Sequence, residues 1–333
     1  MEFVDIAGLR RSASRIGLGT WSIGGWMWGG TDESTAVRTI LKAFEMGINV
    51  VDTAPVYGFG VSEEIVGKAL AAHGKRDEIL ILTKAGLEWD GNGIRRNSSR
   101  ARLEKEIVDS LKRLGTEYID LYQIHWPDTA VPFEETAETL ERLKQKGLIR
   151  AIGVSNFSPA QMDRFRTRAP LSIDQPPFNL FERGIEKEVL PYCRTNNIRT
   201  VVYGVLCRGL LSGTVTADRS YSGDDLRKID PKFSGERLPH YLEAVRRIDA
   251  HARERHGKDV LAFSVRWALD RPGVDVVLWG ARTPEQLSPI PRILGWKTRS
   301  EDASPIDRIL EESIPDPVGP EFMAPPESMA KTN

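Results

Sequence analysis

The chain has 333 residues, of which 40% are hydrophobic and 28% are charged, a composition typical of a globular protein with a large core. Its 46 Lys and Arg residues nearly balance 47 Asp and Glu residues, and the net charge of -1 argues against a nucleic-acid partner. The first residues lack the basic and apolar parts of a signal peptide, and no run of about twenty apolar residues follows. We therefore expect a cytoplasmic protein that does not span a membrane.

The two cysteines, Cys193 and Cys207, are far apart and have no histidine pair beside them. This spacing predicts neither a disulfide framework nor a metal site, and buried free thiols are the simpler interpretation.

Short β-rich segments alternate with helical patterns along the whole chain. Strands are expected at residues 15–21, 48–54, 78–85, 118–126, 149–157, 171–175, 198–204 and 274–280. Helices are expected at residues 34–46, 62–72, 99–114, 133–147, 158–168 and 186–197, with two more across 238–270. Ser62 and Ser158 are the expected N-caps of two of these helices.

Repeated strand and helix units are typical of a parallel sheet covered by helices. Eight units without a linker predict an α/β fold with one closed (β/α)₈ TIM barrel, spanning residues 1–333 as a single domain. A doubly wound sheet with an appended domain is the alternative.

Four segments exceed a minimal barrel. Residues 1–14 are expected to form a β-hairpin, turned at Ala7 and Gly8, that caps the bottom of the barrel. Long loops at residues 21–33 and 211–238 follow strands, so they fall at the C-terminal face, and two extra helices are expected. The proline-rich tail, residues 314–333, is expected to drape over the surface or to remain disordered.

Polar residues interrupt three strands at their carboxyl ends. Asp52, Lys84 and His125 each end a strand, and Tyr57 follows Asp52 closely. Each residue taken alone is better explained as structural. Because a barrel brings its strand ends together, their joint placement favours one catalytic pocket.

The chemistry of these four side chains suggests carbonyl reduction. A buried Lys84 needs a partner such as Asp52, and its ammonium is expected to lower the pKa of the Tyr57 phenol toward neutrality. Tyr57 would then act as a general acid, His125 would orient a carbonyl oxygen, and Trp126 would form an apolar wall. Since no side chain donates hydride, a reduced nicotinamide is required.

Seven motifs now show a family resemblance. "GLGTW", "DTAPVYGFGVSEEIVGKAL", "ILTKAG", "IDLYQIHWPD", "IGVSNF", "GLLSG" and "WGARTPEQL" together resemble the aldo-keto reductases, in order, from Arg15 to Leu287. The resemblance implies a (β/α)₈ barrel and an NADPH-dependent carbonyl reductase. Its catalytic tetrad would be Asp52, Tyr57, Lys84 and His125.

The same resemblance implies how NADPH or NADP⁺ would bind. Residues 203–213, here called the phosphate loop, would wrap the pyrophosphate with backbone amides and Arg208. The nicotinamide carboxamide would contact Ser155, Asn156 and Gln175, and Tyr203 would stack under the ring. The full set of expected cofactor contacts is Gly19, Thr20, Trp21, Asp52, Ser155, Asn156, Gln175, Tyr203, Gly204, Leu206, Cys207, Arg208, Gly209, Gly280, Arg282 and Gln286.

The last strand is expected to lead into a helix with Thr283 as its N-cap. Arg282 would pair with a 2′-phosphate, which favours NADP over NAD, and Gln286 would face the adenosine. Ser288 and Ile290 stand where family members usually carry an acidic residue and an asparagine, so this chain departs from the family at its adenine contacts.

Within the family, the loops and tail resemble bacterial members of the glycerol dehydrogenase type. This implies a small hydroxylated aldehyde or oxo-sugar as substrate, bound by Trp21, Trp26, Trp28, Tyr57, His125 and Trp126. A non-catalytic NADP(H)-binding regulatory subunit of the channel-associated type is the alternative. The sequence leaves open whether the chain forms a homo-oligomer.

Overall fold

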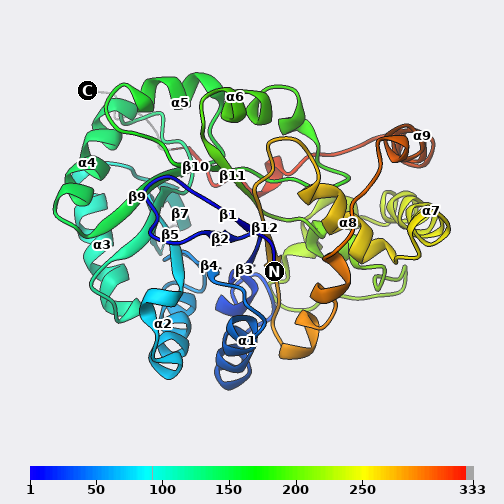
Figure 1. Cartoon of the computed structure of the whole chain (residues 1–333), viewed down its shortest axis with the longest axis horizontal. Helices are drawn as coiled ribbons and strands as arrows, with labels where there is room; N and C mark the ends of the chain where they lie inside the picture. The colour runs from blue at the N-terminus through cyan, green and yellow to red at the C-terminus, as the bar shows by residue number, and fades with distance from the viewer. Residues whose placement is uncertain (92, 328–333) are drawn as a thin grey trace.

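The computed structural model describes residues 1–91 and 93–327. Within these residues, eight parallel strands close into a barrel surrounded by helices, which confirms the predicted (β/α)₈ fold (Figure 1). The strands follow one another around the barrel in chain order, and the last pairs with the first. They are β3 (Ile16–Gly19), β4 (Val50–Asp52), β5 (Leu80–Ala85), β8 (Ile119–Ile124), β9 (Ile149–Ser155), β10 (Ile173–Gln175), β11 (Arg199–Val202) and β12 (Val276–Gly280).

The helices form the outer layer. The first six follow successive strands; they are α1 (Glu33–Glu45), α2 (Val61–His73), α3 (Arg100–Leu114), α4 (Phe133–Gln145), α5 (Pro159–Arg166) and α6 (Val189–Thr195). Two helices, α7 (Leu238–His256) and α8 (Val260–Leu269), follow β11, and α9 (Ala303–Ser313) precedes the tail.

Local capping was predicted correctly in one helix and wrongly in two places. Ser158 caps α5 in a capping box with Gln161. Ser62 does not cap α2, which begins at Val61; its hydroxyl instead lies 2.7 Å from the Thr20 hydroxyl, under the site. The helix expected after Thr283 is only a 3₁₀ turn, Pro284–Leu287, and the Thr283 side chain does not cap it. Prolines at 289 and 291 explain the missing α-helix, because both would fall inside it and each lacks a backbone donor.

Inside the barrel, side chains change from apolar to polar toward the carboxyl ends of the strands. The lower layers are apolar and include Val50, Leu82 and Leu121. Two residues further along their strands, and therefore on the same inner face, stand Asp52, Lys84 and Gln123. Strand periodicity thus brings the polar residues together above a packed apolar core.

Gly153 lies where the barrel interior leaves no room for a side chain. A Cβ atom at Gly153 would lie 2.7 Å from Ile173 Cγ1 and 2.9 Å from Gln123 Cγ. We therefore expect Gly153→Ala to reduce the free energy of unfolding by about 1–3 kcal/mol through overpacking. Urea denaturation would measure this loss. Gly235→Ala is the matched control, because its added Cβ meets no atom within 4 Å, and equal stability losses in both variants would contradict the explanation.

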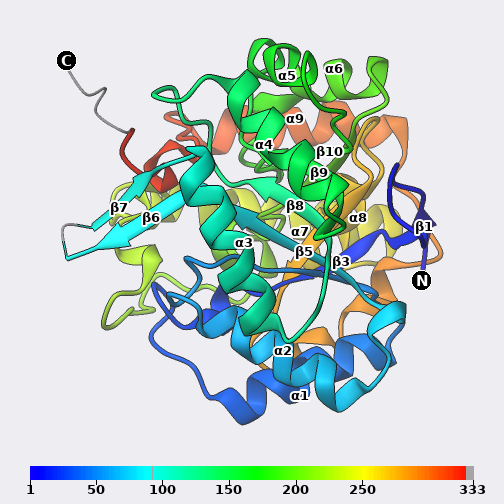
Figure 2. The same cartoon turned by 90° about the vertical axis from the view of Figure 1, so that its left-hand side faces the viewer.

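Two hairpins flank the barrel at opposite ends (Figure 2). The predicted N-terminal hairpin pairs β1 (Phe3–Val4) with β2 (Ala13–Ser14), and Ile6 and Ala13 pack into the lower apolar layers. A second hairpin, β6 (Leu87–Asp90) with β7 (Gly93–Arg96), follows β5 and was not predicted. It projects from the face that carries the polar residues.

The tail folds back over the barrel. Between residues 314 and 327, the backbone N–H of Val318 donates to the Tyr241 hydroxyl at 3.2 Å, and Arg96 donates to the carbonyl of Pro325 at 3.0 Å. The rest of the predicted tail, residues 328–333, lies outside the described residues. Among those described, no helix has the length and apolar character needed to cross a membrane.

Candidate active site

The four predicted catalytic side chains meet at the carboxyl end of the barrel. Asp52 ends β4, Lys84 lies near the end of β5, His125 follows β8, and Tyr57 lies in the turn after β4. Lys84 and Asp52 are almost completely buried, at 1% and 2% exposure. Such burial requires that the two charges compensate each other.

Lys84 links the acid to the phenol. Its Nζ lies 2.5 Å from Asp52 Oδ1 and 3.1 Å from the Tyr57 hydroxyl, and it also donates to the Thr53 carbonyl at 3.0 Å. The His125 ring stands edge-on to the Tyr57 ring, with centroids 5.7 Å apart. A carbonyl oxygen reaching the Tyr57 hydroxyl would therefore come close to the imidazole as well.

The expectation that Lys84 lowers the pKa of Tyr57 is wrong for the protein without cofactor or substrate. Burial raises the pKa of Tyr57 well above its usual value, and the negative charge of Asp52 raises it further. Burial also lowers the pKa of Lys84, which Asp52 opposes. Because Asp52 neutralises the ammonium, the phenolate gains little and Tyr57 remains a proton donor.

His125 is held neutral. Burial lowers the pKa of His125 well below its usual value, and the nearby charge of Lys84 lowers it further. A neutral imidazole carries one N–H, so His125 donates one hydrogen bond without adding a positive charge to the pocket.

Amide side chains form the next part of the pocket floor. Gln175 Nε2 donates to Asp52 Oδ2 at 2.8 Å, and Asn156 Nδ2 donates to the His125 carbonyl at 3.1 Å. The Tyr203 hydroxyl donates to Asn156 Oδ1 at 2.9 Å, and the Ser155 hydroxyl donates to the Gln175 carbonyl at 2.7 Å. The predicted carboxamide contacts are thus fixed beside the catalytic side chains.

A single cleft of about 630 Å³ joins these groups to the predicted phosphate and adenosine segments. All predicted cofactor and substrate residues line it except Cys207, and of the catalytic four only Lys84 lies behind the wall. A Cβ atom added to Gly280 would meet no atom within 4 Å, so the cleft has open space there. Its lining residues and volume fit an extended nicotinamide dinucleotide.

Comparison with known proteins identifies the family. The model of the Aldo/keto reductase family matches residues 15–311. The chain belongs to the aldo/keto reductase family. It is therefore an NAD(P)-dependent oxidoreductase that acts on carbonyl and alcohol groups.

Several aldo-keto reductases resemble it over most of their length. Aldo-keto reductase YhdN from Bacillus subtilis is 57% identical over 98% of both chains. The NADH-specific methylglyoxal reductase of Escherichia coli is 36% identical, over 82% of this chain and 87% of that protein. The structure of glycerol dehydrogenase AKR11B4 from Gluconobacter oxydans has a TM-score of 0.87 and 50% identity, covering 97% of this chain and 99% of that one.

In this aldo-keto reductase, the phosphate loop has an unusual backbone. Cys207 and Arg208 have φ angles of 48° and 52°, a left-handed conformation that favours glycine. The Cys207 side chain packs in the core, where burial raises the pKa of its thiol. The predicted cofactor contact of Cys207 is therefore wrong for this side chain, because it points away from the cleft. The Arg208 guanidinium, expected to contact phosphate, instead forms ion pairs with Glu182 and Asp230.

The expected adenosine end of the cleft is linked by hydrogen bonds to residues 21–33, here called the tryptophan loop. Arg282 donates to the carbonyls of Trp28, at 2.8 Å, and Gly30. Gln286 accepts from the Arg282 backbone N–H at 2.7 Å. Ile290 is buried in the core, so its side chain does not reach the cleft.

Aromatic rings line the catalytic end of the cleft. Trp21 stacks on Tyr57 with centroids 6.0 Å apart and meets Trp28 edge-on at 5.7 Å. Trp26 and Trp126 also line the cleft. The predicted substrate residues are therefore brought together.

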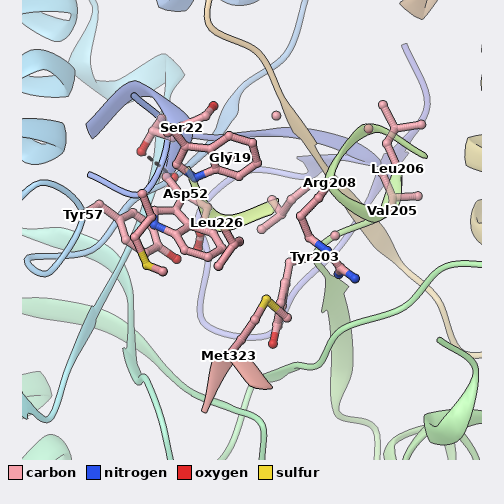
Figure 3. Close-up of a pocket in the computed structure, with 18 of the residues that line it drawn as sticks. Gly19, Ser22, Asp52, Tyr57, Tyr203, Val205, Leu206, Arg208, Leu226 and Met323 are labelled. Carbon is pink, nitrogen blue, oxygen red and sulfur yellow. Dashed lines mark hydrogen bonds between the residues drawn. The ribbon is translucent and has the colours of Figure 1, made fainter. Parts of the chain in front are cut away.

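Other residues of the wall were not predicted. The β6–β7 hairpin contributes Leu87 and Ile94, the loop at residues 211–238 contributes Leu226, and the tail contributes Met323. Figure 3 shows Leu226 and Met323 in the pocket with Tyr57 and Tyr203. The sequence "DGNG" between two alternating segments was a usable hairpin signal, whereas the proline-rich tail gave none.

One other group within the described residues has metal-ligand chemistry. Candidate ligand atoms of His251, His256 and Asp302 lie within 4.8 Å of one another. Each imidazole Nε2 is 2.9 Å from a different oxygen of Asp302, and Asp302 also accepts from the Arg299 backbone N–H. Hydrogen bonds account for this arrangement without a cation.

Proposed function

We propose that this enzyme uses NADPH to reduce the carbonyl of a small hydroxylated aldehyde or oxo-sugar, reversibly, with Tyr57 as the general acid. Bound NADPH would supply hydride to the carbonyl carbon. The observation that carries the proposal is the chain of contacts from Asp52 through Lys84 to the Tyr57 hydroxyl at the floor of the cleft. Tyr57 would protonate the developing alkoxide while neutral His125 donates a hydrogen bond to the same oxygen.

The substrate class is supported by the wall and by the relatives. Indole rings of Trp21 and Trp28 offer flat faces to the C–H surfaces of a polyol or sugar. A relative that is 50% identical is named glycerol dehydrogenase, and another at 36% is named methylglyoxal reductase. Both names describe small, oxygen-rich molecules.

NADP is the preferred cofactor in this proposal because the Arg282 guanidinium stands at the expected adenosine end. Two of its N–H groups already bind carbonyls of the tryptophan loop, so the remaining donors would face a 2′-phosphate.

The test is a spectrophotometric assay with glyceraldehyde and propanal, each with NADPH and with NADH. We expect kcat/KM to be about tenfold higher for the hydroxylated aldehyde and for NADPH. Equal or faster turnover of propanal would contradict the substrate class, and a preference for NADH would contradict the cofactor assignment.

The two reaction directions should respond differently to pH. Because the pKa of Tyr57 is raised and that of His125 is lowered, both groups are already in the form needed for reduction between about pH 6 and 9. Reductive kcat/KM should therefore be nearly flat in this range. Alcohol oxidation needs the phenolate, so its rate should still be rising at pH 9. Oxidation that reaches a plateau by pH 8, with reduction falling above it, would contradict the raised pKa.

A further inference from the structure

Arg208 belongs to a cluster of buried charges beside the cleft. Its guanidinium contacts Glu182 through two nitrogens, at 2.6 and 3.0 Å, and Asp230 through the third, at 2.7 Å. Lys232 joins them, with Nζ 2.8 Å from Glu182 Oε1. We call these four residues the buried ion cluster; their side chains are at most 3% exposed, and two positive charges face two negative ones.

The cluster joins segments that are distant in sequence. Glu182 lies in the loop after β10, Arg208 in the phosphate loop, and Asp230 and Lys232 in the long loop before α7. Charges this deeply buried are stable only while their partners stay in place. The position of each of these loops therefore depends on the others.

The tail is attached to the same cluster. Lys232 Nζ donates to the Gly319 carbonyl at 3.0 Å, and the Phe322 ring lies 5.6 Å from the Arg208 guanidinium carbon. Phe322, Met323 and Pro325 line the cleft together with Arg208. Figure 3 shows Met323 and Arg208 in the pocket. The Arg208 side chain thus contacts Phe322, a wall residue of the cleft, and also the carboxylates of Glu182 and Asp230.

The backbone of the phosphate loop indicates why such support is needed. Left-handed φ angles at Cys207 and Arg208 are unfavourable for residues with side chains, and they persist only where the surroundings fix them. The ion pairs of Arg208 supply that constraint directly.

We propose that Arg208 is a positioning residue that couples the phosphate loop to the C-terminal tail. Ordering the loop around the cofactor favours docking of the tail, and the docked tail in turn favours the ordered loop. The tail, which already lines the cleft, is then held more firmly when cofactor is bound. Only the part of this inference that concerns cofactor binding rests on the proposed NADPH-dependent function.

Hydrogen exchange of the tail, followed by mass spectrometry, tests the coupling. In the full chain without cofactor, we expect Arg208→Met to accelerate exchange at residues 318–327 by about tenfold or more, because the cluster no longer holds them. Adding NADPH should slow tail exchange in the parent protein but not in Arg208→Met. Arg208→Lys should restore little of the tail's protection from exchange, since one ammonium cannot span both carboxylates.

Two further variants separate coupling from loss of folding. Lys232→Met breaks the link to Gly319, and Phe322→Ala removes the ring over Arg208, so both should loosen the tail. Arg237→Met is the matched control; it breaks a more exposed tail pair, with Asp316, outside the cluster. If Arg208→Met does not fold, these two variants decide the question.

Activity adds a second readout. Loosening the tail should raise KM for the aldehyde by about tenfold, with a smaller effect on kcat, because the tail forms wall and not catalytic floor. Tail exchange that is unchanged in all cluster variants would overturn the proposal. Failure of the proposed function would look different: the parent would show no turnover, while the cofactor-free exchange result would stand.

Discussion

Tyr57→Phe is expected to lower kcat for aldehyde reduction by about 10²–10⁴-fold, the usual contribution of a general acid. The substitution removes one oxygen and leaves the ring stacked on Trp21. NADPH affinity should change by less than about threefold, because the lost hydroxyl contacts Lys84 and the substrate oxygen but not the expected phosphate or adenosine segments. Steady-state kinetics and quenching of tryptophan fluorescence by NADPH would measure both quantities.

Tyr118→Phe is the matched control. Its hydroxyl bonds to Asp77 on the surface, outside the cleft, so turnover should remain near that of the parent. A Tyr57→Phe variant that keeps about a tenth or more of the parental kcat would fall short of the lower limit for general acid catalysis, about 10²-fold, and would contradict the role proposed for Tyr57.

Lys84→Met is expected to abolish measurable turnover and also to destabilise the fold. Removing the ammonium leaves the Asp52 carboxylate buried at 2% exposure without its cation. Breaking a buried pair from one side costs about 3–5 kcal/mol of unfolding free energy. Denaturation in urea at pH 7 would measure this loss, and single-turnover assays would measure the chemistry.

The double variant Asp52→Asn with Lys84→Met separates the two effects. Removing both charges should recover most of the lost stability, because no unpaired ion remains buried. Activity should not recover, since Tyr57 would still lack its ammonium neighbour. Recovery of turnover in the double variant would show that Lys84 serves the fold and not the reaction.

The location of the strand-end side chains was predictable, because all parallel strands of a barrel end at the same face. An apolar segment that stops at Asp52, Lys84 or His125 places that side chain at the carboxyl edge, and eight such strands have only one common edge. The convergence of these three side chains therefore followed from the sequence pattern alone.

The electrostatics of the site were not predictable in the same way. Whether Lys84 lowers the pKa of Tyr57 depends on the burial of the phenol and on the distance between Lys84 and Asp52. Neither can be read from the sequence. The ion pairs of Arg208 were not predicted for a related reason. Its partners Glu182 and Asp230 lie 26 and 22 residues away and meet it only in the folded chain.

Draping of the tail over the surface was one of two expectations, but its docking at the cleft was not predicted, because composition is a poor guide to docking. Its prolines prevent regular structure, yet single contacts with Tyr241, Lys232 and Arg96 are enough to hold it at the cleft. Each of those contacts uses a backbone group of the tail, so the tail sequence gave no side-chain pattern to detect.

The positions of Met1 and Glu327 have a practical consequence for handling this enzyme. Met1 belongs to the hairpin segment at the closed end of the barrel, whereas Glu327 contacts Arg96 beside the opening (Figure 2). An affinity tag or a resin linkage at the first residue leaves the entrance clear. The same attachment at the last residue would extend from the tail, which borders the entrance. Immobilised enzyme prepared in the two orientations should therefore differ in substrate access.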